Sequence, residues 1–150
     1  MDSLPMVLGF PDYEVPGRRL AEALGYEFTA VNLHRFPDGE SKVTLPAALP
    51  ARVVLCRSLD RPNEKLVELL LTAETARTLG ARHVTLVAPY LCYMRQDIAF
   101  HPGEAVSQRI IGRLLAQHFD AVITVDPHLH RIRHLNEAMP GIHARALSCA

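Results

Sequence analysis

Three short segments of this sequence carry side chains that suit the binding of a nucleotide or its phosphates. They are 35–40 (RFPDGE), 89–97 (PYLCYMRQD) and 126–130 (DPHLH). Each follows a run of apolar residues that is typical of a buried strand. Ligands of open α/β sheets bind outside the carboxyl ends of the strands, so all three segments are candidates for a binding site.

Segment 36–40 has two interpretations. Phe36 offers a flat face for a planar base, and Asp38 and Glu40 offer acceptors for an amino group or for ribose hydroxyls. Pro37-Asp38-Gly39 is also a common turn tripeptide, which needs no ligand. The local sequence leaves both interpretations open.

The other two segments combine groups that suit phosphates or a metal. Arg95, Gln96 and Asp97 place a guanidinium, an amide and a carboxylate on one loop, and the planar fork of arginine suits phosphate oxygens. A solvated polar loop would have the same composition. His128 follows an Asp-Pro pair, where its imidazole would ligate a metal or, when charged, hold phosphate.

Several kinds of site are disfavoured. The spacing of His128, His130 and His134 is compatible with zinc, but no cysteine or acidic partner completes the set, and a surface cluster of histidines remains the alternative. Neither G-x-x-x-x-G-K-[ST] nor G-x-G-x-x-G occurs. The three cysteines are odd in number and lack C-x-x-C spacing, which predicts reduced, packed thiols in a cytosolic protein.

Composition narrows the class of protein. The chain has 150 residues, of which 49% are apolar, which suits one domain with its own core. Sixteen basic residues balance sixteen acidic ones, which argues against a nucleic-acid binder. With no 18-residue apolar run and no signal peptide pattern, we expect no membrane association and a cytoplasmic location.

The elements that must position these residues alternate between strand and helix. Apolar runs predict strands at 6–10, 28–33, 41–45, 52–56, 83–90, 121–126 and 142–150. Apolar residues at helical spacing predict helices at 16–24, from 62 to about 79, around 110–119 and at 130–138. This order predicts an α/β fold, a mostly parallel sheet flanked by helices in a Rossmann-like three-layer domain.

Four motifs in this order resemble the N-terminal half of ribose-phosphate diphosphokinases, also called phosphoribosyl pyrophosphate synthetases. The motifs are FPDGE (36–40), PYLCYMRQD (89–97), FHPGEAVS (100–107) and VDPHLHRI (125–132). The similarity extends over nearly the whole chain and is weakest in residues 1–25. It implies a phosphoribosyltransferase-like domain and the transfer of diphosphate from Mg²⁺-ATP to ribose 5-phosphate, with AMP leaving.

The resemblance also implies roles for individual residues. The turn of residues 36–40 matches one that holds adenosine, typically in the site of a neighbouring subunit, so a homo-oligomer is implied. The loop of residues 95–97 matches an ATP-binding loop, and His128 matches a histidine that helps to hold Mg²⁺. The implied ATP-binding residues are Phe36, Asp38, Gly39, Glu40, Arg95, Gln96 and Asp97.

The chain departs from the family in two ways. Ile98 and Ala99 occupy positions that are commonly basic, and Asp-Pro-His-Leu replaces the frequent Asp-Leu-His-Ala. The family's ribose-5-phosphate loop, catalytic lysine loop and second metal-binding aspartate belong to a second domain that nothing here matches. We therefore expect residues 1–150 to be the ATP-side N-terminal domain, with no catalytic residue and no activity alone.

The sequence is also compatible with two other functions. One is a non-catalytic subunit that binds or regulates an active synthetase, for which Ile98 and Ala99 are the support in the sequence. The other is a different nucleotide-binding α/β protein, such as a phosphoribosyltransferase, which would bind phosphoribosyl pyrophosphate itself.

Overall fold

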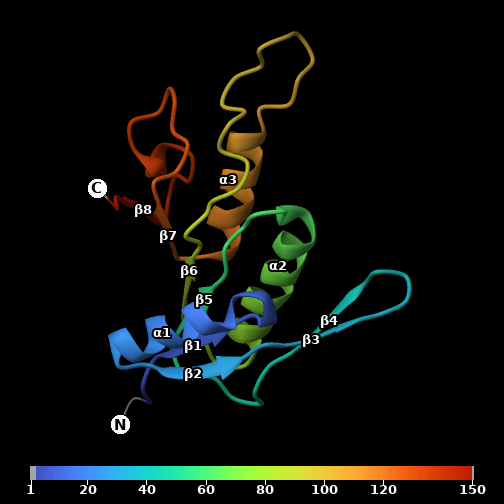
Figure 1. Ribbon diagram of the computed structural model, residues 1–150, viewed down its shortest axis with the longest axis vertical. Coiled ribbons are helices and arrows are strands. Elements are labelled where there is room, and N and C mark those ends of the chain that lie inside the picture. Colours follow the sequence, from blue (N-terminus) through green and yellow to red (C-terminus); the bar gives the residue numbers. More distant parts are fainter. Residues whose placement is uncertain (1–2, 150) are drawn as a thin grey trace.

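Residues 3–149, which the computed structural model describes, form a six-stranded sheet, a separate two-stranded sheet and three α-helices (Figure 1). Every strand of the larger sheet is parallel to its neighbours, in the order β2-β1-β5-β6-β7-β8. These strands are β1 (Met6–Gly9), β2 (Glu27–Ala30), β5 (Arg52–Cys56), β6 (His83–Val87), β7 (Ala121–Val125) and β8 (His143–Leu147). The predicted mostly parallel sheet is confirmed.

Helices cover both faces of this sheet. On one face lies α1 (Glu14–Leu24), whose Ala21 belongs to a small buried cluster with residues of β1 and β5. On the other face lie α2 (Pro62–Thr78) and α3 (Ser107–His118). The apolar stripe predicted for α2 is confirmed, since four of its members are buried: Leu66, Leu69, Ala73 and Ala76.

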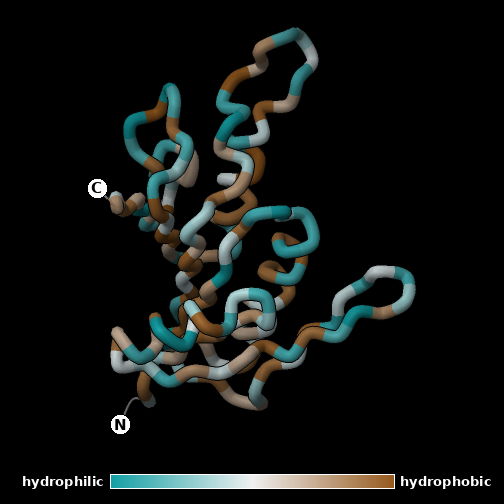
Figure 2. The backbone as a smooth tube through the Cα atoms, in the orientation of Figure 1, coloured by the Kyte–Doolittle hydropathy of each residue, from teal (hydrophilic) through white to brown (hydrophobic). Residues whose placement is uncertain are grey.

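The register of the sheet aligns the core. Leu8, Leu55, Leu86 and Val122 are successive partners across four strands, and all four side chains are fully buried. In Figure 2 hydrophobic segments gather where the strands cross the middle of the molecule. The inner strands β1 and β5 are buried on both faces, which explains why near-continuous apolar runs predicted them.

One predicted strand, 28–33, is wrong because the run belongs to two sheets. It divides at Val31, whose side chain is buried and whose N–H donates to the Gly9 carbonyl. The chain then leaves the edge of the main sheet as β3 (Asn32–Arg35), which pairs with antiparallel β4 (Ser41–Thr44). The result is a hairpin that projects from the body (Figure 1).

The helix predicted at 130–138 is also wrong, since only the 3-10 turn η2 (Leu135–Glu137) forms there. The Glu137 carboxylate accepts the backbone N–H groups of Arg133 and His134, each at 2.8 Å, which offers these donors an alternative to a helix. A 3-10 turn of the same length, η1 (Pro11–Tyr13), precedes α1. The strand predicted at 142–150 covers only 143–147, and its Ala150 lies outside the described residues.

Within the described residues, no helix combines the length and hydrophobicity needed to cross a membrane.

Candidate functional site

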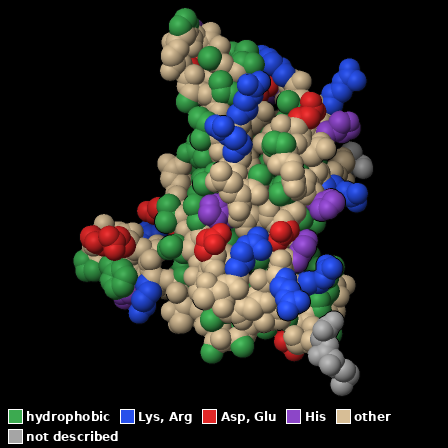
Figure 3. Space-filling model, turned by 180° about the vertical axis from the view of Figure 1, so that it is seen from behind, with side chains coloured by type: hydrophobic (Ala, Val, Ile, Leu, Met, Phe, Trp, Pro, Cys, Tyr) green, Lys and Arg blue, Asp and Glu red, His purple; other side chains and the backbone are tan. Residues whose placement is uncertain are grey.

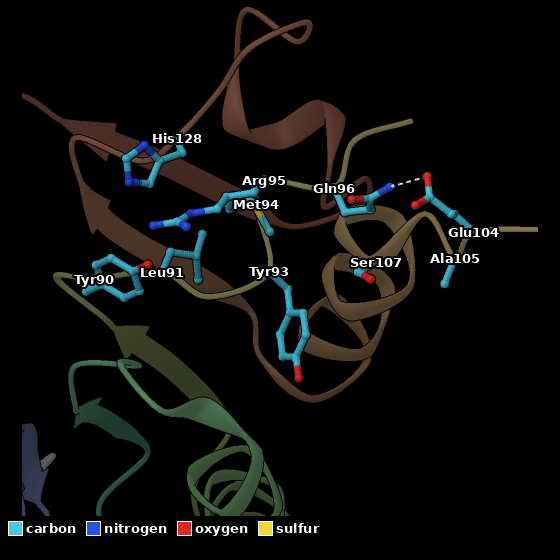
Figure 4. Close-up of a pocket in the computed structure, with 10 residues that line it drawn as sticks. All are labelled: Tyr90, Leu91, Tyr93, Met94, Arg95, Gln96, Glu104, Ala105, Ser107 and His128. Atoms are coloured by element: carbon cyan, nitrogen blue, oxygen red, sulfur yellow. Dashed lines mark hydrogen bonds between the residues drawn. The ribbon is translucent and has the colours of Figure 1, made fainter. Parts of the chain in front are cut away.

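A cavity of about 510 Å³ opens beyond the carboxyl ends of β6 and β7. Its walls come from the loop after β6, the start of α3 and the loop after β7, as Figure 4 shows. The residues that line it are Tyr90, Leu91, Tyr93, Met94, Arg95, Gln96, Glu104, Ala105, Ser107 and His128. Three of the residues predicted to bind ATP or metal, Arg95, Gln96 and His128, are therefore brought together.

One end of the cavity is cationic. Arg95 and His128 lie near each other there with Tyr90, whose ring is 6.5 Å from that of His128 between centroids (Figure 4). Arg95 is exposed, and it makes no ion pair or hydrogen bond with any residue in the range 3–149. An uncompensated guanidinium in a concave site suits an anionic group such as a phosphate.

The opposite end offers mainly oxygen acceptors. The Gln96 Nε2 donates to the Ile98 carbonyl at 2.8 Å and approaches the Glu104 Oε1 at 3.5 Å. The same carboxylate oxygen accepts the His101 N–H at 2.7 Å, which closes the tip of the projecting loop. The amide oxygen of Gln96 and the hydroxyl of Ser107 remain as polar groups of this end.

The loops around the site contain strained residues. Arg61, Tyr93 and Asp126 have φ values of 49°, 59° and 42°, and they follow β5, β6 and β7 respectively. A non-glycine residue in this region costs roughly 1–3 kcal/mol and persists only where its surroundings fix it. Two of the three have such contacts: the Tyr93 hydroxyl donates to Asn63 Oδ1 at the start of α2, and the Asp126 N–H donates to the Leu147 carbonyl.

Asp97 lies outside the cavity wall. Its side chain is 1% exposed, and its Oδ1 accepts a hydrogen bond from Arg131 Nη1 at 2.5 Å. Its Oδ2 is buried without a hydrogen-bond partner. The direct ATP contact implied for Asp97 stays a prediction, since the carboxylate here faces the protein.

The other predicted residues lie at the hairpin tip, away from this cavity. All residues of the tip are exposed, and Figure 3 shows acidic and hydrophobic side chains projecting there from the body. Asp38 Oδ1 accepts the Glu40 N–H at 3.0 Å, and Gly39 adopts a φ of 95°, so the segment forms a tight turn. Gly39 and Glu40 line a second cavity with α2. One chain therefore does not unite Phe36, Asp38, Gly39 and Glu40 with Arg95 and His128.

The crevice between β1 and β5, where the strand order reverses, is filled by the protein's own charges. The side chain of Arg57 is 5% exposed and contacts Asp12 at 2.9 Å and Glu68 at 3.5 Å. Lys65 bonds to Asp60 at 3.0 Å, and this hydrogen bond lowers the pKa of the Asp60 carboxyl. Ligands of such sheets usually bind at the reversal. Here the open cavity is displaced toward β6 and β7.

The donors of the cavity suit a magnesium ion only when phosphates accompany it. The described residues contain no group of three or more His, Cys, Asp or Glu side chains placed to hold a metal. Mg²⁺ prefers oxygen and is often held by one or two carboxylates together with substrate phosphates and water. Glu104, at the oxygen-rich end, supplies one such carboxylate, while His128 supplies nitrogen.

Sequence reasoning missed four polar residues of this cavity, Tyr90, Tyr93, Glu104 and Ser107. All lie within motifs that the sequence already distinguishes, but no local pattern shows which of their side chains face a cavity.

Comparison with known proteins shows which family the chain belongs to. Residues 13–118 match the family model of the N-terminal domain of ribose phosphate pyrophosphokinase. The chain belongs to this family. Arg95 and Gln96 lie within the matched range of this pyrophosphokinase domain, whereas His128 lies beyond it.

Two similar curated proteins are also ribose-phosphate pyrophosphokinases. The chain is 46% identical over 113 residues to the ribose-phosphate pyrophosphokinase of Methanopyrus kandleri, an alignment that covers 75% of this chain and 39% of the relative. It is 39% identical over 112 residues to that of Saccharolobus solfataricus, covering 73% and 38%. The chain thus spans about two fifths of the length of these curated relatives.

A solved structure has the same fold. The phosphoribosylpyrophosphate synthetase of Mycobacterium smegmatis superimposes with a TM-score of 0.80 at 20% sequence identity. The superposition covers 97% of this chain and 49% of that one.

Proposed function

We propose that this chain is the ATP-side, N-terminal domain of a ribose-phosphate diphosphokinase, and that the cavity beyond β6 and β7 binds the phosphates of Mg²⁺-ATP. The observation that carries the proposal is the meeting of Arg95 and His128 at one end of the cavity, from two different loops (Figure 4). Family membership and the unpaired guanidinium of Arg95 support the same assignment.

The chemistry of the reaction fits these residues. Diphosphoryl transfer develops negative charge on phosphate oxygens, which placed cations stabilise. In our proposal Arg95 binds phosphate oxygens and His128 orients them. Mg²⁺, bound with ATP, would neutralise phosphate charge, and Glu104 is the carboxylate within the cavity that suits it.

The second substrate, ribose 5-phosphate, has no evident site among the described residues. We propose that the remainder of the longer protein binds it, and that residues 1–150 alone release no AMP. The two lysines of the chain do not supply a catalytic group at the cavity, because Lys42 lies on β4 and Lys65 is paired with Asp60 and Asp12.

The hairpin is proposed to act in a second copy of the chain. Its tip carries an aromatic ring and two carboxylates that the body of its own chain leaves exposed. Phe36, Asp38 and Glu40 would complete an adenosine pocket in a homo-oligomer, which Gly39 permits by turning the chain.

Calorimetric titration of the 150-residue chain with Mg²⁺-ATP tests the proposal. Arg95→Gln is expected to weaken binding by about tenfold or more, because a charge-assisted hydrogen bond contributes about 1.5–3 kcal/mol. Arg113→Gln, an exposed change on α3 with the same loss of charge, is the control. Absence of Mg²⁺-ATP binding by the unaltered chain, or equal losses in both variants, would overturn the assignment.

A non-catalytic interaction subunit is the second candidate. Its support is the loop after Asp97, where the apolar Ile98 and Phe100 are 37% and 50% exposed. The full-length protein discriminates between the two functions, since only an enzyme forms phosphoribosyl pyrophosphate from ATP and ribose 5-phosphate.

A further inference from the structure

We propose that Asp97 and Arg131 form a positioning pair that holds together the two loops of the cavity. The nucleotide part of this inference rests on the proposed function, but the contact between the loops does not. The pair gives Asp97 a role other than direct ATP binding.

The position of the pair in the chain connects it to the cavity. Asp97 directly follows Gln96 and lies two residues after Arg95, while Arg131 lies three residues after His128. The ion pair therefore joins the two loops within three residues of Arg95 and His128, which form the cationic end of the cavity. Any separation of the two loops at this point would move Arg95 relative to His128.

The two partners differ in burial. The Asp97 side chain is 1% exposed and the Arg131 side chain is 49% exposed, with 2.5 Å between Oδ1 and Nη1. The guanidinium of Arg131 also lies over the ring of Phe100, 5.2 Å from its centroid. Arg131 thus contacts the loop after β6 at two places, at Asp97 and at Phe100.

No second polar contact duplicates this one. Among residues 3–149, the Asp97–Arg131 bond is the one hydrogen bond or ion pair that joins segment 91–106 to segment 127–140. Other polar contacts between these regions lie at the base, where the Pro89 carbonyl accepts from Val125 N–H and Thr124 Oγ1. Gln108 hydrogen-bonds to the carbonyls of Met94 and Gln96 and so ties them to α3, but it makes no hydrogen bond to the described segment 127–140.

The chemistry of Asp97 makes the pair hard to replace. A buried carboxylate requires a counter-charge, and its second oxygen, Oδ2, already lacks a partner. Without Arg131 the carboxylate would need water, so the loop that carries Arg95 would open toward solvent. The pair therefore favours the closed arrangement of the two loops.

Hydrogen exchange on the 150-residue chain tests the loop contact without a ligand. Arg131→Gln is expected to raise exchange about tenfold in segments 91–108 and 126–134, with the strands unchanged, and Arg131→Lys to restore part of the protection. Arg133→Gln is the matched control, because Arg133 is exposed, lies two residues away and loses the same charge. Equal exchange in Arg131→Gln and in the unaltered chain would overturn the proposal.

Mg²⁺-ATP titration tests the consequence for the cavity. Arg131→Gln and Asp97→Asn are each expected to weaken binding about tenfold, and the double variant no more than either single one, since both remove the same contact. Additive losses, or an equal loss in Arg133→Gln, would contradict a positioning pair. If Asp97→Asn does not fold, the comparison of Arg131→Gln with Arg131→Lys tests the positioning pair instead. If the unaltered chain binds no ATP, the proposed function fails while the exchange experiment still decides the loop contact.

Discussion

The carbonyl oxygen of Ala138 lies against the α-carbon of Gly112, in the middle of α3. A β-carbon added at Gly112 would overlap this oxygen, well inside the 3.0 Å that real β-carbons keep. The contact joins α3 to the loop that begins at Asp126 and carries His128 and η2. A helix that supplies one wall of the cavity is thus placed against the loop that supplies another.

Gly112→Ala is expected to destabilise the protein by about 1–3 kcal/mol, because the added methyl group displaces backbone. Helix propensity alone predicts the opposite sign, a gain of roughly 0.5–1 kcal/mol. Urea denaturation measures the difference. Arg113→Ala, on the exposed side of α3, is the control and should change stability by no more than about 0.5 kcal/mol. A stabilised Gly112→Ala protein would show that the loop moves freely away from α3.

Removal of Arg57 is expected to be costly. Arg57→Met leaves the buried Glu68 carboxylate with Arg35, 3.9 Å away, as its remaining cation. Breaking one side of a buried pair costs about 3–5 kcal/mol, and chemical denaturation should show a loss near the lower value because Asp12, the other partner, is partly exposed. Arg18→Met, which breaks the exposed pair with Glu14, should cost less than about 1 kcal/mol. Equal losses in the two variants would contradict this account.

Asp120 should make stability depend on pH. Burial opposes ionisation of its carboxyl, but the Val84 N–H at 2.8 Å and the Arg77 guanidinium at 3.1 Å outweigh it and lower the pKa below the usual 3.8. A lowered pKa in the folded state stabilises the protein above 3.8, and this contribution is lost as pH falls through the lowered value. Asp120→Asn should therefore lower Tm at pH 7, and the difference from the unaltered protein should shrink toward pH 3.

Glu22→Gln is the control for this titration, because Glu22 is exposed on α1 and makes no ion pair with another described residue. A Tm difference for Asp120→Asn that stays constant between pH 7 and pH 3 would exclude the charge of Asp120 as its source.

The three cysteine thiols should differ in their reactivity toward a disulfide reagent. Burial raises the pKa of Cys56 to about 11 and that of Cys92 to about 12, whereas Cys149 is exposed. The thiolate is the reactive form, so a disulfide reagent at pH 8 should modify one thiol of the native protein quickly and all three after unfolding. Cys149→Ser should abolish the fast phase. Rapid modification of Cys92 in the native state would show that the loop after β6 opens.

Much of the fold followed from periodicity. Strands buried on both faces appear in the sequence as apolar runs, and α2 shows its buried stripe at helical spacing. The break at Val31 did not follow, because one apolar run there serves the edge of one sheet and the start of another. The loop of residues 130–138 did not follow either, since the Glu137 carboxylate takes backbone donors that a helix would otherwise use.

Part of the candidate site could be predicted from the positions of its residues after the strands. Arg95 and His128 follow apolar strands, and neighbouring parallel strands bring their carboxyl ends to one edge. The burial of Asp97 depends on Arg131, 34 positions away, and no local pattern contains that distance. The left-handed backbone of Tyr93, in the loop after β6, depends likewise on Asn63, at the start of α2.

The core of the protein does not extend to the tip of the hairpin. Its packing against the core comes from Leu33, Val43 and Leu45, while every residue from Phe36 to Glu40 is exposed. Changes to the side chains of Phe36 and Glu40 should therefore cost little stability, whereas Gly39, with a φ of 95°, and Asp38, whose Oδ1 accepts the Glu40 N–H, hold the turn. In protein engineering, new side chains could be introduced on either side of a retained Asp38-Gly39 turn while the parallel sheet remains intact.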